Sequence, residues 1–103
     1  MQLTSQQPGY FQIFLGPMNS GWYFQANCPC GCGNNVFVSL DMKGDPARPG
    51  THRWGWDGDL ERPTLTPSLR RTDTCKAHFN LDAGVYTIHA DGAPAAPNLY
   101  RAL

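Results

Sequence analysis

Four cysteines in two short clusters constrain the fold of this chain more than any other feature. Cys28, Cys30 and Cys32 are separated only by one proline and one glycine, and Cys75 is followed closely by His78. Thiolates and imidazoles are ligands that Zn²⁺ prefers, and small turn residues between close cysteines are typical of a zinc knuckle. We therefore predict one zinc ion that joins the two clusters.

The five possible donors exceed the four positions of a closed zinc site. Cys28 and Cys32 have three residues between them, whereas Cys30 is one residue from each, so the wider pair wraps round an ion most easily. Cys75 and His78 have the two-residue gap that is usual for zinc ligands. We predict Cys28, Cys32, Cys75 and His78 as the ligands. Cys30 is then an alternate ligand, a thiol beside the site, or simply a small, partly buried residue.

The composition predicts β-structure. The 103 residues include 11 glycines and 9 prolines, which interrupt helices, and the aromatic and β-branched residues occur in short runs. These runs predict strands at residues 10–15, 21–26, 36–40, 53–56, 77–81 and 85–88. We expect a mostly β fold, a small antiparallel sheet with a zinc-ribbon-like knuckle, in a single domain over residues 1–103.

Three segments are expected to lie outside this sheet. Residues 63–69 carry prolines four apart, so we expect an extended stretch that crosses the site without joining the sheet. Residues 42–51 are rich in glycine and proline and are expected to form a loop. The tail from Gly92 should be loosely ordered unless Leu99 and Tyr100 dock.

Charge and hydropathy narrow the range of partners. Eight basic and eight acidic residues give zero net charge, without the basic stripe that nucleic-acid binding needs. Residues 1–7 lack the basic segment of a secretory signal, and the apolar run at residues 10–15 is too short to span a bilayer. We expect a cytoplasmic protein without a membrane or nucleic-acid partner. In that reducing compartment, thiol clusters indicate metal sites rather than disulfides.

Glu61 and Ser68 are the candidates for chemistry beside the zinc. Glu61, the only glutamate, is predicted to accept a proton from metal-bound water and pass it to the leaving group; otherwise it is a solvated side chain paired with a nearby arginine. Ser68 is predicted to donate a hydrogen bond to a substrate carbonyl or a developing oxyanion, although most serines in such a segment bond local backbone. No histidine and acid occur at a recognisable spacing from Ser68, so a serine nucleophile is not indicated. His52 and His89 are expected to be surface or hydrogen-bonded histidines.

Several separated motifs resemble a known family of small domains. They are the Cys-Pro-Cys-Gly-Cys-Gly cluster, Trp54-Gly-Trp56, the segment Glu61–Leu69, Cys75-Lys-Ala-His-Phe79 and a hairpin at Gly84. Over residues 24–92 the chain resembles short zinc-binding proteins of unknown function found in phages, and similar proteins encoded beside ubiquitin-like modifiers and E1- and E2-like enzymes in bacterial operons. Phage members have Cys-Pro-Gly-Cys-Gly, with no counterpart of Cys30.

The resemblance implies a zinc-dependent peptidase that processes or removes a ubiquitin-like modifier. Trp54 and Trp56 would form the wall of a peptide groove. Several thiolates make zinc-bound water less acidic, however, and the chain lacks a His-Glu-x-x-His helix. The alternative is a non-catalytic, structural zinc domain that mediates protein–protein contacts, and a third reading is single-strand binding through the knuckle and the tryptophans.

Overall fold

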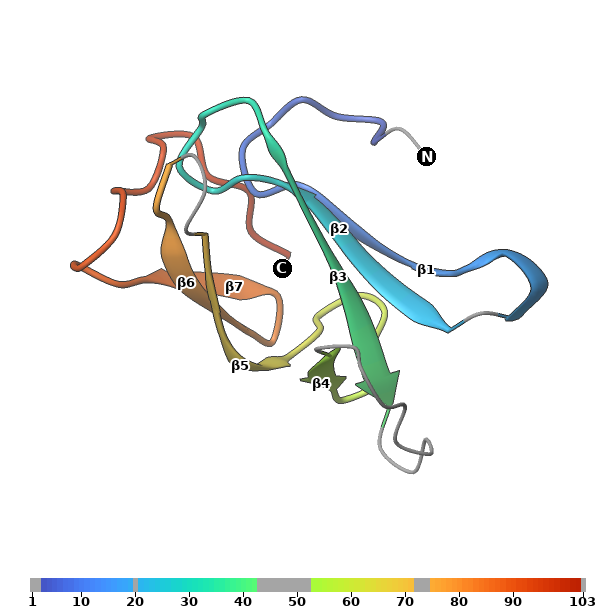
Figure 1. The fold of residues 1–103 in the computed structure, drawn as a ribbon. Coiled ribbons are helices and arrows are strands. Elements are labelled where there is room, and N and C mark those ends of the chain that lie inside the picture. The colour runs from blue at the N-terminus through green and yellow to red at the C-terminus, as the bar shows by residue number, and fades with distance from the viewer. Residues whose placement is uncertain (1–2, 20, 43–52, 72–74, 103) are drawn as a thin grey trace.

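The computed structural model describes residues 3–19, 21–42, 53–71 and 75–102. Within these ranges, seven strands form one sheet in sequence order (Figure 1). The strands are β1 (Phe11–Leu15), β2 (Trp22–Asn27), β3 (Asn35–Met42), β4 (Arg53–Trp56), β5 (Leu65–Arg70), β6 (His78–Asp82) and β7 (Val85–Ile88), with a 3₁₀ turn at Pro17–Asn19. The predicted mostly β fold is confirmed.

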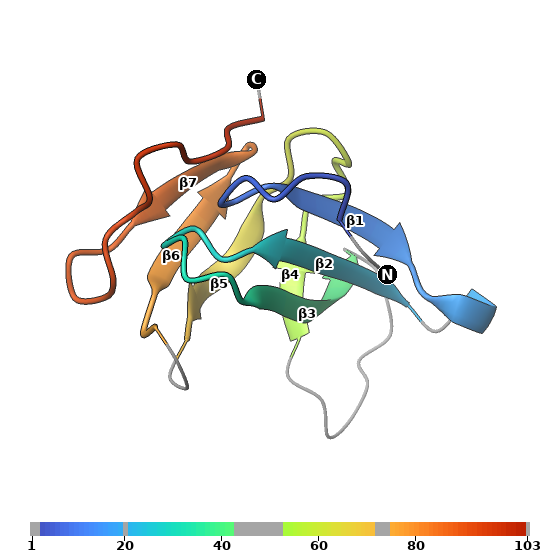
Figure 2. The same cartoon turned by 90° about the horizontal axis from the view of Figure 1, so that it is seen from above.

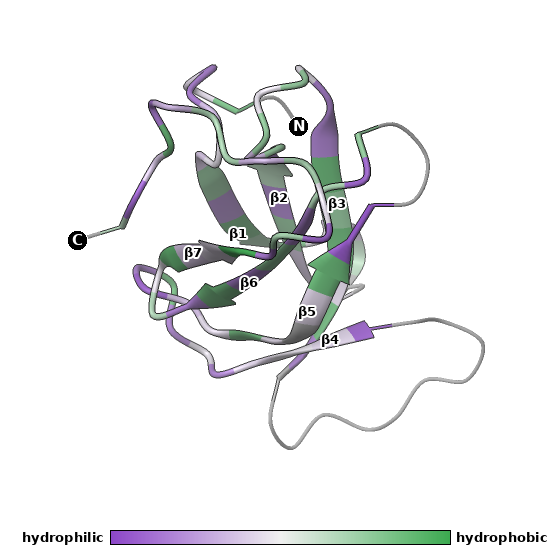
Figure 3. Ribbon diagram, turned by 90° about the vertical axis from the view of Figure 1, so that its left-hand side faces the viewer, coloured by the Kyte–Doolittle hydropathy of each residue, from purple (hydrophilic) through white to green (hydrophobic). Residues whose placement is uncertain are grey.

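Apolar and polar residues alternate along the strands, and this alternation gives the sheet an inner and an outer face (Figure 3). Phe24 of β2 and Phe79 of β6 are fully buried on the inner face. On the outer face of β1–β3, the rings of Phe14, Tyr23 and Phe37 pack together, and 58% of Phe37 is exposed.

The sheet folds over on itself around one core. β1–β2–β3 and β5–β6–β7 form two groups that β4 connects, as the second view shows (Figure 2). Side chains from both groups belong to the same buried cluster, including Phe11 and Leu40 from one group and Leu69 and Leu81 from the other. Burial of this apolar surface is the main stabilising contribution.

One pair of strands departs from the antiparallel prediction. β3 and β4 are parallel, with Ser39 opposite Arg53 and Met42 opposite Trp56. A tight hairpin turn cannot join a parallel pair, and residues 43–52, between the two strands in the chain, lie outside the described residues. The predicted loop at 42–51 therefore falls almost wholly outside the described residues, as does His52.

The prediction that residues 63–69 stay out of the sheet is wrong. Leu65–Arg70 is β5, which pairs with β4 on one side and with β6 on the other. Proline cannot donate a ladder hydrogen bond, and the fold accommodates Pro67 through a register shift between Leu65 and Leu69. The shift lies next to Ser68.

The C-terminal segment docks against the sheet. Backbone N–H groups of Ala96, Tyr100 and Ala102 donate to the carbonyls of Pro29, Pro8 and Gly84, respectively. Leu99 and Tyr100 pack against the core, so the docking that the sequence left open does take place. None of the described residues forms a helix that is long and apolar enough to cross a membrane.

Candidate active site and metal centre

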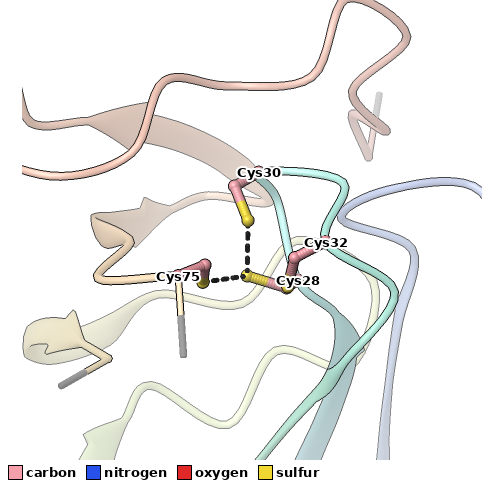
Figure 4. Close-up of side chains that lie close together, drawn as sticks. All are labelled: Cys28, Cys30, Cys32 and Cys75. Atoms are coloured by element: carbon pink, nitrogen blue, oxygen red, sulfur yellow. Dashed lines mark hydrogen bonds between the residues drawn. The ribbon is translucent and has the colours of Figure 1, made fainter. Parts of the chain in front are cut away.

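The four cysteines converge at one end of the sheet (Figure 4). Cys28, Cys30 and Cys32 lie on the turn between β2 and β3, and Cys75 lies just before β6. All four Sγ atoms are within 4.8 Å of one another, and none of the cysteines forms a disulfide. Cys28 Sγ is 3.4 Å from the Sγ atoms of both Cys30 and Cys75.

The thiols differ in how readily they ionise. Burial raises the pKa of Cys28 well above its ordinary value, and burial also raises the pKa of Cys30. Burial acts in the same direction on Cys75, but hydrogen bonds from the Ala77 backbone N–H and from the neighbouring thiols outweigh it and lower its pKa to about 7. Of these three thiols, Cys75 is thus the one that most readily loses its proton to an incoming metal ion.

The cluster fits a tetrahedral metal ion such as zinc. A zinc–sulfur bond of about 2.3 Å places tetrahedral sulfurs about 3.8 Å apart, which agrees with four sulfurs that all lie within 4.8 Å. Three of the four ligands predicted from the sequence, Cys28, Cys32 and Cys75, belong to this group. The fourth member is Cys30, whereas His78 makes other contacts.

His78 instead lies between a serine and an aspartate. Its Nε2 is 2.9 Å from Ser68 Oγ, and its Nδ1 is 2.8 Å from Asp91 Oδ1. Arg70 of β5 lies opposite His78 of β6, and Ser68, two residues earlier and within the register shift, is within hydrogen-bond reach of His78 on the outer face. The strand register thus brings together a serine and a histidine that are ten residues apart in the chain.

The Asp91 carboxylate fixes the tautomer of His78. Hydrogen bonds from His78 and then from Arg70 hold the pKa of Asp91 below its usual range, so the carboxylate is ionised and only accepts. The proton of a neutral imidazole is therefore on Nδ1, and Nε2 accepts from the Ser68 hydroxyl. The ionised carboxylate also contributes to folding stability above the ordinary carboxyl pKa, and this contribution is lost as the pH falls through the lowered pKa.

Two further side chains hold the histidine and the aspartate in place. Arg70 Nη2 donates to Asp91 Oδ2 at 2.6 Å and lies 3.1 Å from His78 Nδ1. The ring of His89 stacks on that of His78, with centroids 4.2 Å apart, and His89 Nε2 bonds Asn80 Oδ1. His89 thus has a hydrogen-bond partner, as the sequence led us to expect.

The metal centre and the Ser–His–Asp group share a segment of chain. Cys75 is three residues before His78, and the Ala77 carbonyl between them accepts a hydrogen bond from the Arg71 N–H at 2.7 Å. A metal ion held by Cys75 and the knuckle would therefore hold the start of β6, where His78 lies. The arrangement links metal binding to the position of the imidazole.

Glu61 lies far from the cysteines along the sheet. It is exposed on the turn between β4 and β5, where its backbone N–H donates to Asp59 Oδ1 at 2.9 Å. This turn precedes Leu65, whereas Cys75 is beyond the other end of β5. Six residues of strand span about 17 Å. The catalytic role of Glu61 stays a prediction, and the structure does not bring Glu61 to the cysteine cluster.

Sequence reasoning missed Asp91 and the pairing of Ser68 with His78. The alternation at 77–81 shows that His78 and Asn80 face away from the core, and this polar face on a predicted strand was the available signal. To interpret this polar face, one must know which strand lies beside residues 77–81, and residues 63–69 were expected to stay out of the sheet. Without β5 in place, Ser68 has no visible histidine neighbour.

Comparison with known families identifies a match over most of the chain. A family model described as bacterial ubiquitination-like system serine protease (BubE) matches residues 4–89. The match includes the cysteine cluster, Ser68 and His78, and it ends two residues before Asp91. No curated protein and no solved structure matches the chain.

Proposed function

This chain belongs to the BubE family of bacterial ubiquitination-like system serine proteases, and we propose that Ser68, His78 and Asp91 are its catalytic triad. The observation that carries the proposal is the continuous hydrogen-bonded series from Ser68 Oγ through both ring nitrogens of His78 to Asp91. Catalytic triads are recognised by geometry and roles rather than by order in the sequence.

In the proposed mechanism, Ser68 Oγ attacks the substrate carbonyl while His78 Nε2 takes the hydroxyl proton. Asp91 holds the imidazole in the required tautomer and stabilises the imidazolium that forms. His78 then gives the proton to the leaving amine, and an ester of Ser68 with the acyl group remains. Water, activated by the neutral imidazole, hydrolyses this ester and regenerates Ser68.

The four cysteines in this proposal bind a structural zinc ion. Zinc prefers thiolate ligands, and four protein ligands leave no position for a water molecule. The ion would cross-link the β2–β3 knuckle to the start of β6 and so support His78. The zinc-dependent mechanism predicted from the sequence is thereby replaced by a serine mechanism on a domain that a metal stabilises.

The proposed substrate is a ubiquitin-like protein whose terminal peptide or isopeptide bond is cleaved. The family belongs to a bacterial ubiquitination-like system, which supports a protein substrate. A cytoplasmic location accompanies this proposal, because a reducing compartment keeps four thiols available for a metal. The non-catalytic alternative has no comparable support, since it gives no role to the contacts of Ser68 and His78.

The test is cleavage of a ubiquitin-like fusion protein by the full chain. We expect Ser68→Ala to reduce kcat by roughly 10⁵- to 10⁶-fold, as the loss of a nucleophile does in other triads. A fluorophosphonate should label Ser68, as peptide mass spectrometry would show. Cleavage by the Ser68→Ala variant at the original rate would contradict the proposal.

Glu61→Gln serves as the matched control for the mechanism predicted from the sequence. Glu61 is exposed and lies beyond the opposite end of β5 from Cys75, so we expect kcat to stay within about twofold of the original value. A large loss of kcat in a folded Glu61→Gln variant would instead support a metal-bound water with Glu61 as its base.

A further inference from the structure

A groove separates the first half of β3 from the second half of β5. β4 lies between these two strands in the sheet, but it pairs only with residues 39–42 of β3 and with Leu65 and Thr66 of β5. Beyond Arg53, where β4 begins, residues 35–38 of β3 and 69–70 of β5 have no described strand between them. The groove has a volume of about 330 Å³. Its lining includes Phe37, Val38, Trp54, Leu69, Arg70 and Arg71.

Backbone groups on both sides of the groove point into it. The Cys28 N–H donates to the Asn34 carbonyl at 2.9 Å, and hydrogen-bonding direction alternates along a strand, so the N–H and C=O of Phe37 point away from β2. On the other side, the Arg71 N–H donates to Ala77, so the N–H and C=O of Arg70 point away from β6.

Two side-chain contacts indicate the width of the groove. Arg71 Nη1 reaches across and donates to the Asn35 carbonyl at 2.8 Å, and Trp54 Nε1 lies 3.4 Å from the Ser68 carbonyl. Long side chains, rather than backbone N–H groups, bond these carbonyls. β3 and β5 therefore stand further apart here than the roughly 4.8 Å between paired strands.

We propose that this groove binds the extended tail of the protein substrate as an added strand that bonds the backbones of Phe37 and Arg70. The inference rests on the proposed function, because the groove is lined by Leu69, Arg70 and Arg71, which follow Ser68 directly in the chain. Strand addition recognises the main chain, and alternate side chains of the tail provide specificity. Val38, Trp54 and Leu69 favour an apolar side chain where the tail faces inward. The occupant is thus an unfolded, proline-free tail of a ubiquitin-like protein.

The test is an N-methyl scan of a short synthetic peptide that spans the bond cleaved in the ubiquitin-like fusion. Each variant peptide lacks one backbone N–H, and KM and kcat are measured with the original chain. A strand between β3 and β5 bonds one neighbour and then the other at successive residues, so we expect KM to rise by roughly 3- to 10-fold at the few consecutive positions that lie in the groove and to change little at the positions outside it. Equal effects at all positions, or none, would overturn the inference and leave the serine mechanism intact.

A pair of protein variants tests the same groove from the other side. Phe37→Pro removes an N–H that points into the groove and not toward β2, whereas Phe37→Ala removes the ring and keeps that N–H. We expect KM for the peptide to rise in Phe37→Pro beyond its value in Phe37→Ala. Equal KM values in the two folded variants would overturn the inference. If a fluorophosphonate fails to label Ser68 in the original chain, the proposed function itself is overturned.

Discussion

At the scale of single residues, His78 connects the chemistry to the rest of the fold. Its two ring nitrogens contact Ser68 and Asp91, and its ring stacks on His89. Only 15% of its side chain is exposed, whereas 54% of Asp91 is exposed. The imidazole is therefore held from several sides, and the carboxylate depends on its hydrogen bonds for its position.

Asp91→Asn tests the role of the carboxylate. The asparagine side chain can present either its N–H or its carbonyl oxygen to His78 Nδ1. The imidazole then loses its preference for the tautomer with the proton on Nδ1, in which Nε2 accepts from Ser68. We expect kcat to fall by roughly 10²- to 10⁴-fold with KM little changed, the upper limit being the effect in a buried triad. Steady-state kinetics on the fusion protein measure this. An unchanged kcat would remove Asp91 from the triad.

Arg70→Gln should change the pH dependence of cleavage. Arg70 lies beside both His78 Nδ1 and Asp91 and helps to lower the pKa of Asp91. Without this cation, the pKa of Asp91 rises toward its ordinary value, so the carboxylate that orients His78 is protonated at a higher pH. We expect the acid limb of the kcat/KM profile to move to higher pH. Because the arginine is about half exposed, the difference should shrink at high salt.

Gly92→Ala should disturb the triad through the backbone. A β-carbon at Gly92 would lie 2.6 Å from the Lys76 carbonyl oxygen and 2.8 Å from the backbone nitrogen of His78. The segment that carries Asp91 must then move away from β6. We expect a fall in kcat without loss of zinc. If a crystal structure of the variant kept the contact between His78 and Asp91 and the rate were unchanged, the close approach would have no catalytic role.

At the scale of elements, the sequence predicted the strands better than their pairing. Alternation and turn residues were sufficient to predict β1, β2, β6 and β7 to within one residue of their observed bounds. The parallel pairing of β3 with β4 and the place of β5 depend on contacts between distant segments, which local patterns do not contain. Sequence spacing was sufficient to predict three of the four clustered cysteines as metal ligands, whereas the pairing of Ser68 with His78 required β5 to lie beside β6.

The knuckle and β6 provide a direct comparison of Cys30 with His78 as metal ligands. We expect Cys30→Ala to lower zinc affinity by more than roughly 100-fold. Removal of a metal ligand lowers the affinity more than removal of a side chain that only hydrogen-bonds to a ligand. His78→Ala should keep the zinc and lose cleavage. Competition with a chromogenic chelator measures both affinities. The reverse pattern would restore the ligand set predicted from the sequence.

At the scale of the whole molecule, the metal would join segments that the core alone holds weakly. The apolar cluster draws on every strand, but the knuckle and Cys75 lie at its edge, and Cys28 is the one buried cysteine of the four. A small domain gains much of its stability from such a cross-link. Removal of zinc should therefore lower the melting temperature by at least roughly 10 °C, since each 1 kcal/mol shifts it by about 4–8 °C in a domain of this size.

Exchange of the metal distinguishes a structural ion from a catalytic one in the intact chain. Cd²⁺ is a soft ion that suits four thiolates, so it should occupy the cysteine site and restore the melting temperature after zinc is removed. Because Ser68 and His78 perform the chemistry in the proposed mechanism, we expect the cadmium-loaded chain to cleave the fusion protein within about threefold of the zinc-loaded rate, whereas a metal-bound water would change its acidity with the ion. The melting temperature serves as the control for correct loading. A cadmium-loaded chain that melts like the zinc form but does not cleave would show that the metal takes part in the reaction. In that case the metal would need an open coordination position, which four cysteine ligands do not leave.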